Sequence, residues 1–178
     1  DIIVPHLSDF ETPQTLRITA IVDATMWNCI AVYDTQLLDA LTNERPVVVA
    51  SDDIIRQHGT AQTKLLCIGY VGVIVGSYII PKVKQEAIPI YESYNLDPDY
   101  LEINDEVLKC ANFYDEVGCL QNVAEIYGYI PAIMAQIIGY QAINYLKDDG
   151  WNQEGDIGSD GKECTANCRA YSDTTNYK

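Results

Sequence analysis

The stretch that decides the fold is Leu65–Ile80, LLCIGYVGVIVGSYII, which carries no charged residue. Gly69, Gly72 and Gly76 recur within it every three or four residues, which places them along one side of a helix. A membrane-spanning helix needs about 20 consecutive apolar residues. The stretch therefore predicts a core helix that its neighbours approach closely at the glycines, and no membrane span is expected.

A second uncharged run, Ile126–Leu146, is long enough to cross a bilayer. Polar side chains without partners are costly in lipid, and this run contains three of them: Gln136, Gln141 and Asn144. We therefore predict a second core helix, from about Pro131 to Lys147.

Two further segments precede the uncharged core. After an irregular arm of about 12 residues, Thr15–Tyr33 is apolar nearly all round, which predicts a buried helix. Ser51 followed by two aspartates is typical of a helix start, because a hydroxyl caps the first turn and the helix dipole favours acids there. That helix is predicted to run to Ile80.

Helix-breaking and turn-forming residues divide the part of the chain between the two uncharged runs. Pro81 should end one helix and open the next at its first helical position. Asn95–Asp99, NLDPD, is rich in turn-forming residues and predicts a turn. A further helix is expected near Leu101–Phe113.

The sequence thus predicts an all-α fold, a helical bundle with a long irregular carboxy-terminal arm. Residues 1–147 form the helical domain, and period-2 alternation is nearly absent apart from Val47–Val49. Residues 148–178 are rich in Gly, Asp, Asn, Ser and Thr. We expect this arm to pack on the same domain or on a partner chain.

The charge balance excludes one class of partner. With 11 Lys and Arg against 26 Asp and Glu, the formal net charge is -15. Nucleic-acid binding depends on cations that neutralise phosphates, so no nucleic-acid partner is expected. The charge is compatible with a bound cation, a basic partner or simple solubility.

The six cysteines predict disulfide bonds, and therefore a secreted, extracellular protein. No cysteine lies in a CxxC pair, and the two histidines, His6 and His58, are not at zinc-ligand spacing. Six cysteines allow 15 pairings. We predict that each of two local loops closes on itself and that the two cysteines in apolar helices meet in the core, which gives the pairs Cys110–Cys119, Cys164–Cys168 and Cys29–Cys67.

Four segments resemble, in order, the amino-terminal half of the vanadium-haloperoxidase-related proteins: Ala31–Asp34, Asn95–Asp99, Ala142–Asp156 and Ala170–Tyr177. These proteins belong to the superfamily of vanadium haloperoxidases and type 2 phosphatidic acid phosphatases. The resemblance implies an all-helical bundle in which Lys, Arg and His cradle vanadate or phosphate. It also implies halide oxidation by peroxide or phosphate ester hydrolysis as the activity of the complete protein.

The chain departs from that superfamily at its catalytic signature. Arg45–Pro46 lacks the Lys expected before it, no Pro-Ser-Gly-His segment occurs, and neither histidine has a matching context. No catalytic or cofactor-binding residue is therefore predicted in this chain. The resemblance implies a non-catalytic helical half, with the vanadate or phosphate site in another chain or in a missing carboxy-terminal half.

An alternative from another class is an extracellular structural or interaction protein that assembles with copies of itself, its arm docking on a neighbouring copy. The partner discriminates between the two hypotheses. The first requires a different chain that carries the Arg and His residues, whereas the second allows copies of this chain alone.

One acidic loop is a weak candidate for calcium. Asp156, Asp160 and Glu163 place oxygen ligands around Gly161, as calcium loops do. Gly158 and Asn167 stand where acids are expected, so a solvated acidic loop is the favoured alternative.

Two single residues invite a functional reading. Asp23 within an apolar helix has two readings: a buried acid of raised pKa or, as the favoured alternative, a carboxylate paired with Arg17 or capped by a neighbouring helix. His58 follows two isoleucines and predicts a core histidine rather than a ligand. Trp27 and the tyrosines are expected to serve mainly in core and rim packing, and the alternative is that they line a pocket or contact a partner.

Overall fold

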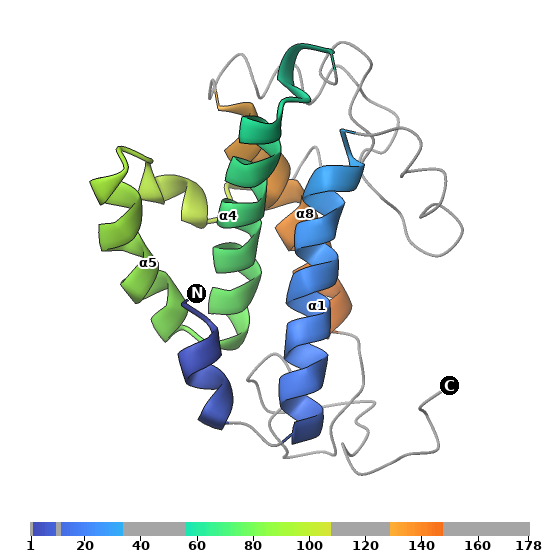
Figure 1. Cartoon of the computed structure of the whole chain (residues 1–178), viewed down its shortest axis with the longest axis vertical. Coiled ribbons are helices and arrows are strands. Elements are labelled where there is room, and N and C mark those ends of the chain that lie inside the picture. Colours follow the sequence, from blue (N-terminus) through green and yellow to red (C-terminus); the bar gives the residue numbers. More distant parts are fainter. Residues whose placement is uncertain (1, 10–11, 34–55, 108–128, 148–178) are drawn as a thin grey trace.

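The computed structural model describes residues 2–9, 12–33, 56–107 and 129–147 (Figure 1). Over these residues the elements are helical, and no strand occurs among them. The all-α prediction is therefore confirmed for the described part, and the arm at 148–178 lies outside it. The elements are the 3-10 helices η1 (Val4–Asp9) and η2 (Pro98–Leu101) and the α-helices α1 (Thr12–Ala31), α4 (Ala61–Ile79), α5 (Lys82–Ser93) and α8 (Ile130–Lys147).

Helix α4 is the centre of the bundle, with α1, α8 and α5 around it (Figure 1). Its residues from Val71 to Gly76 are all buried, as the uncharged run predicts. The helix is long and apolar enough to cross a membrane, but half of the qualifying window is buried inside the fold. The burial is consistent with the predicted core helix.

The predicted start of this helix is wrong. Residues 56–58 are helical, but the chain then breaks, and Thr60 adopts extended backbone angles as the N-cap of α4. The Thr60 hydroxyl accepts a hydrogen bond from the Thr63 N–H at 3.2 Å. A local cap of this kind satisfies an N–H that the first turn would leave unpaired. Ser51 itself lies outside the described residues.

Helix α1 runs antiparallel to α4, since Cys29 meets Cys67 near one end and Met26 lies beside Gly72 further along. The helix was predicted to be buried all round, and this is wrong. Its core face is defined by residues at helical spacing, Ile18, Ile21, Val22, Thr25 and Cys29. The opposite face is exposed to solvent.

Pro81 separates α4 from α5, as predicted, although it stands at the N-cap of α5 rather than at the first helical position. Helix α5 contains Pro89 and is exposed over most of its length. It packs on the bundle through three residues at four-residue spacing: Val83, Ala87 and Tyr91.

The predicted turn at residues 95–99 is confirmed. Asn95 has a φ of 56°, in the left-handed region that Asn tolerates better than most residues. The Asp97 carboxylate accepts from the Asp99 N–H at 2.9 Å and so caps η2. The helix predicted near residue 101 begins later: Leu101 ends η2, and helical backbone resumes at Asp105.

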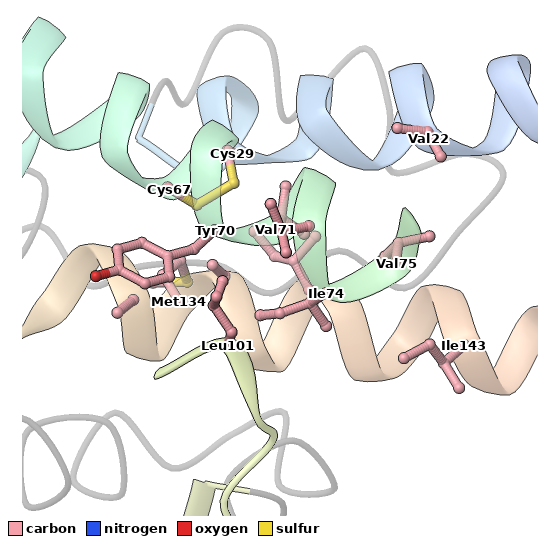
Figure 2. Close-up of a cluster of buried hydrophobic side chains, with 14 of the residues drawn as sticks. Val22, Cys29, Cys67, Tyr70, Val71, Ile74, Val75, Leu101, Met134 and Ile143 are labelled. Carbon is pink, nitrogen blue, oxygen red and sulfur yellow. A yellow bond between two sulfur atoms is a disulfide. The ribbon is translucent and has the colours of Figure 1, made fainter. Parts of the chain in front are cut away.

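Helix α8 confirms the predicted second core helix. It runs in the same direction as α4, because Tyr129 contacts Tyr70 near one end and Gly139 contacts Ile74 further along. A side-chain carbon on Gly139 would stand 2.8 Å from Ile74 Cγ2, so this glycine permits the close approach of the two helices. Figure 2 shows side chains of α4 directed toward α8, with Met134 close to Tyr70.

Candidate functional site

A buried disulfide joins α1 to the central helix α4. Cys29 of α1 and Cys67 of α4 are bonded, with their Cα atoms 5.7 Å apart, and both residues are fully buried (Figure 2). The predicted Cys29–Cys67 pair is thus confirmed. The four other cysteines, Cys110, Cys119, Cys164 and Cys168, lie outside the described residues.

A cluster of four tyrosines fills the space between α4, α5, η2 and the start of α8. Tyr70 is fully buried, and its ring meets those of three others edge-on at centroid distances of 4.9 Å, 6.2 Å and 6.0 Å, namely Tyr91, Tyr100 and Tyr129. The Tyr70 hydroxyl donates to the Asp97 carbonyl at 3.0 Å. The cluster therefore ties the turn before η2 to the central helix.

Burial raises the pKa of each hydroxyl in this cluster. Desolvation is the main cause of the raised pKa of Tyr70, and the other tyrosines and Asp97 add to it. Desolvation, aided by Tyr129, raises the pKa of Tyr91 to about 12. These hydroxyls therefore remain neutral hydrogen-bond donors at physiological pH, and we assign the cluster a packing role.

Gln136 of α8 is 2% exposed and is fully engaged with the backbone around η2. Its Oε1 accepts from the Asn104 N–H at 3.0 Å, and its Nε2 donates to the Tyr100 carbonyl at 3.0 Å. The side chain thereby satisfies two main-chain groups in a segment that has no regular partner. The buried Gln136 amide thus holds the segment around η2 against α8, and this pair of hydrogen bonds is called the backbone clamp.

Replacing Gln136 by leucine is expected to lower the free energy of unfolding by about 1–3 kcal/mol, because two main-chain groups lose their partners. Gln85 lies on the exposed side of α5, so Gln85→Leu serves as the control and should change stability by less than about 0.5 kcal/mol. Urea unfolding followed by circular dichroism measures both. Equal stability of the two variants would show that the clamp contributes nothing.

Two basic side chains of the described part, Lys84 and His6, are each paired with a carboxylate and so do not form an anion site. Lys84 is paired with Glu102, and this hydrogen bond and its charge lower the pKa of Glu102. His6 Nε2 lies 3.2 Å from Glu86, which joins η1 to α5. His58 is half-buried rather than in the core, so that prediction is wrong.

The reading of Asp23 as a buried acid is also wrong, because its side chain is exposed on α1, whereas its pairing with Arg17 stays a prediction. The helix is buried on one face only, and Asp23 lies off that face. Within the described ranges, no group of three or more His, Cys, Asp or Glu side chains could hold a metal ion. The candidate calcium ligands Asp156, Asp160 and Glu163 lie outside these ranges, as does Arg45.

A cavity of about 490 Å³ lies between η1, α1, α4 and α5. Its walls are mostly apolar, with three polar side chains among them, Thr19, Asp23 and Tyr91. Thr19 and Asp23 are exposed, so they stand at its opening, whereas Tyr91 is buried. The volume is within the range of about 300–1,000 Å³ that is usual for small-molecule sites.

Glycines of α4 shape this cavity. Gly69 and Gly72 line it, and a side-chain carbon on Gly72 would stand 3.5 Å from Met26 Sδ. Gly76 lies beyond them and is covered by Ile3 of the amino-terminal segment, at 2.8 Å from the position of the missing carbon. The glycine side predicted from the sequence thus faces a cavity, Met26 of α1 and, at Gly76, Ile3 of the segment before η1.

A second cavity, of about 380 Å³, lies around η2 and α8 and is lined by three carboxylates. Asp97 caps η2, and Glu102 is paired with Lys84. Gln136, which also lines it, is engaged by the backbone clamp. Since these polar groups serve the local structure, we assign no site there.

The outward face of α1 forms an exposed stripe. Its apolar members are four residues at helical spacing, Leu16, Ala20, Ala24 and Trp27, and the exposed Thr19 and Asp23 lie beside them. Leu16 is 66% exposed and Trp27 is 44% exposed. This face, named here the α1 stripe, is on the opposite side of the helix from the core residues.

No protein family, curated protein or solved structure matches the chain. The described part of the chain is a helical bundle in which a buried disulfide joins α1 to α4.

Proposed function

We propose that this chain is a secreted, non-catalytic helical module that packs against another protein chain through the α1 stripe. The observation that carries the proposal is the stripe itself, an apolar face with two large exposed side chains at its ends, Leu16 and Trp27.

The α1 stripe has the composition of a protein contact. Single exposed apolar residues are ordinary on protein surfaces, but here four apolar residues follow one another along a single helix face. Tryptophan is enriched among the residues that contribute most to binding energy at interfaces. The two alanines between the ends allow a partner to approach the helix closely.

Charge favours a different, basic partner over a second copy. A net charge of -15 makes two copies repel each other, whereas it attracts a basic chain and accelerates its association. The resemblance to vanadium-haloperoxidase-related proteins points in the same direction, because a catalytic half would carry the Lys, Arg and His residues that hold vanadate or phosphate. Activity would then belong to the site in that partner, and this chain would be its scaffold.

The compartment is inferred from the cysteines. Disulfides persist in oxidising environments and are rare in the cytosol. The Cys29–Cys67 bond joins the core helices, so it supports secretion of the folded chain. Self-assembly of an extracellular structural protein remains the alternative, and the test below distinguishes the two.

The test is native mass spectrometry of the chain purified from its source under non-reducing conditions, with and without Leu16→Glu and Trp27→Glu together. We expect the unaltered chain to carry a second, basic chain and the double variant to lose it, because two carboxylates would be buried in an apolar contact. The matched control is Ile90→Glu with Tyr94→Glu, which alters one exposed apolar residue of α5 and the exposed residue that follows the helix.

The control variant is expected to keep the partner. Recovery of a monomer from the unaltered chain would contradict the proposal. Assemblies made only of copies of this chain, lost in the stripe variant, would establish the self-assembly alternative in its place.

A further inference from the structure

We propose that the cavity between η1, α1, α4 and α5 binds a small amphiphile, with its apolar tail inside and an amine head at the opening. The cavity uses residues of α1 other than those of the stripe, namely Thr19, Val22, Asp23 and Met26, although Asp23 lies one helical turn before Trp27. The inference needs no partner chain, because all of these residues belong to this chain.

The tail is specified by the walls of the cavity. Side chains from four elements enclose it, and almost all are aliphatic: Ile2, Ile3, Leu7, Val22, Met26, Ile68, Val73 and Val83. An apolar ligand that leaves water for such walls gains free energy in proportion to the apolar area removed from water. Met26 adds a flexible side chain that can adjust to tails of different shape.

The head is specified by the polar groups and by charge. Among the described residues that line the cavity Asp23 is the one carboxylate, and it stands at the opening together with the hydroxyl of Thr19. A carboxylate favours an ammonium group over a carboxylate or phosphate group, and the net charge of -15 acts in the same sense. An aliphatic amine therefore fits better than a fatty acid of the same length.

A third polar group, the Tyr91 hydroxyl, lies inside the cavity. It stands against the wall, 3.3 Å from the position that a Gly69 side-chain carbon would occupy. It stays protonated at physiological pH. It can therefore donate a hydrogen bond to a polar atom on the ligand tail. An amine that carries a hydroxyl group on its tail is thus also compatible with the cavity.

The wall formed by the amino-terminal segment is held in place at three points. Ile3 packs on Gly76, the Thr15 hydroxyl donates to the Leu7 carbonyl at 3.2 Å, and His6 lies 3.2 Å from Glu86. These contacts connect the segment to α4, α1 and α5 in turn. The cavity is therefore formed before a ligand arrives, which lowers the entropic cost of binding.

The experiment compares three probes with the same ten-carbon tail, decylamine, 1-decanol and decanoate, by titration calorimetry of the full chain at pH 7 and low salt. We expect one decylamine per chain, bound about five-fold or more tightly than decanoate. Decanol, which has no charge, should fall between them. Raising the salt should narrow the difference, because the head lies in solvent.

Two pairs of variants locate the site. Thr19→Trp places a large ring at the opening and should abolish decylamine binding, whereas Ala20→Trp, on the next exposed residue, should leave it unchanged. Asp23→Asn should weaken decylamine binding about two- to five-fold with decanoate unaffected or improved. Asp105→Asn, an exposed acid that does not line the cavity, is the control.

Absence of decylamine binding, or equal binding by Thr19→Trp and the unaltered chain, would overturn the cavity as the site. Decanoate binding as tight as decylamine would overturn the amine head. An unchanged amine preference in Asp23→Asn would contradict the role of this carboxylate.

Discussion

Replacing Cys29 and Cys67 together by alanine is expected to lower the free energy of unfolding by about 4 kcal/mol. The bond joins residues separated by 38 positions, and the loss of loop-closure entropy in the unfolded chain gives this magnitude. For a chain of this size the melting temperature should fall by about 8–16 °C. Thermal unfolding followed by circular dichroism in non-reducing buffer measures the change.

The single variant Cys29→Ala is the control, because it opens the same bond. It should lose about as much stability as the double variant, so the two substitutions should be strongly non-additive in a double-mutant cycle. A loss below about 1 kcal/mol in the double variant would show that the bond does not constrain the unfolded chain.

Replacing Tyr70 by alanine is expected to lower the free energy of unfolding by about 3–5 kcal/mol. The ring is fully buried and contacts three other tyrosine rings, so its removal leaves a cavity that the rigid helices around it fill poorly. Tyr70→Phe keeps the ring and loses only the hydrogen bond to the Asp97 carbonyl, which should reduce stability by about 1 kcal/mol.

Tyr94 provides the matched control for the ring. Its side chain is 74% exposed, so Tyr94→Ala should change stability by less than about 0.5 kcal/mol. Urea unfolding of the three variants under one set of conditions gives the comparison. Similar losses from Tyr70→Ala and Tyr94→Ala would contradict the central place of Tyr70 in the core.

The helices could be predicted where helix-breaking residues in the sequence mark their ends. The uncharged run before Pro81 and the run that begins at Pro131 both form core helices, because apolar surface must be buried and prolines limit where helices can extend. The start at Thr60 was missed. A serine followed by acids at residue 51 gave a stronger local signal than the threonine that caps α4.

The cavity could be predicted only in part. The glycines on one side of α4 were visible in the sequence, but the segment that closes the wall comes from residues 2–7, far away along the chain. Gln136 illustrates the same limit. Its presence argued against lipid exposure, whereas its partners, 32 and 36 residues away, depend on tertiary structure.

Tyr33 is a feature with no signal in the sequence. Its side chain is buried at the end of α1, and within the described part of the chain its hydroxyl has no hydrogen-bond partner. Desolvation raises the pKa of this hydroxyl well above its usual value. An unpaired buried hydroxyl costs about 1–3 kcal/mol. Neither composition nor periodicity indicates that this hydroxyl would be buried without a partner among the described residues.

The fold depends on a bundle in which α1 and α4 are joined by a buried disulfide. The most direct measurement is tryptic peptide mapping without reduction on chain purified from its native source. Cleavage should give a peptide of residues 18–56, with Cys29 as its one cysteine, and a peptide of residues 65–82, with Cys67 as its one cysteine. The account predicts that these two peptides are recovered joined to each other. Recovery of both as free thiols, or of either joined to a different cysteine, would contradict it.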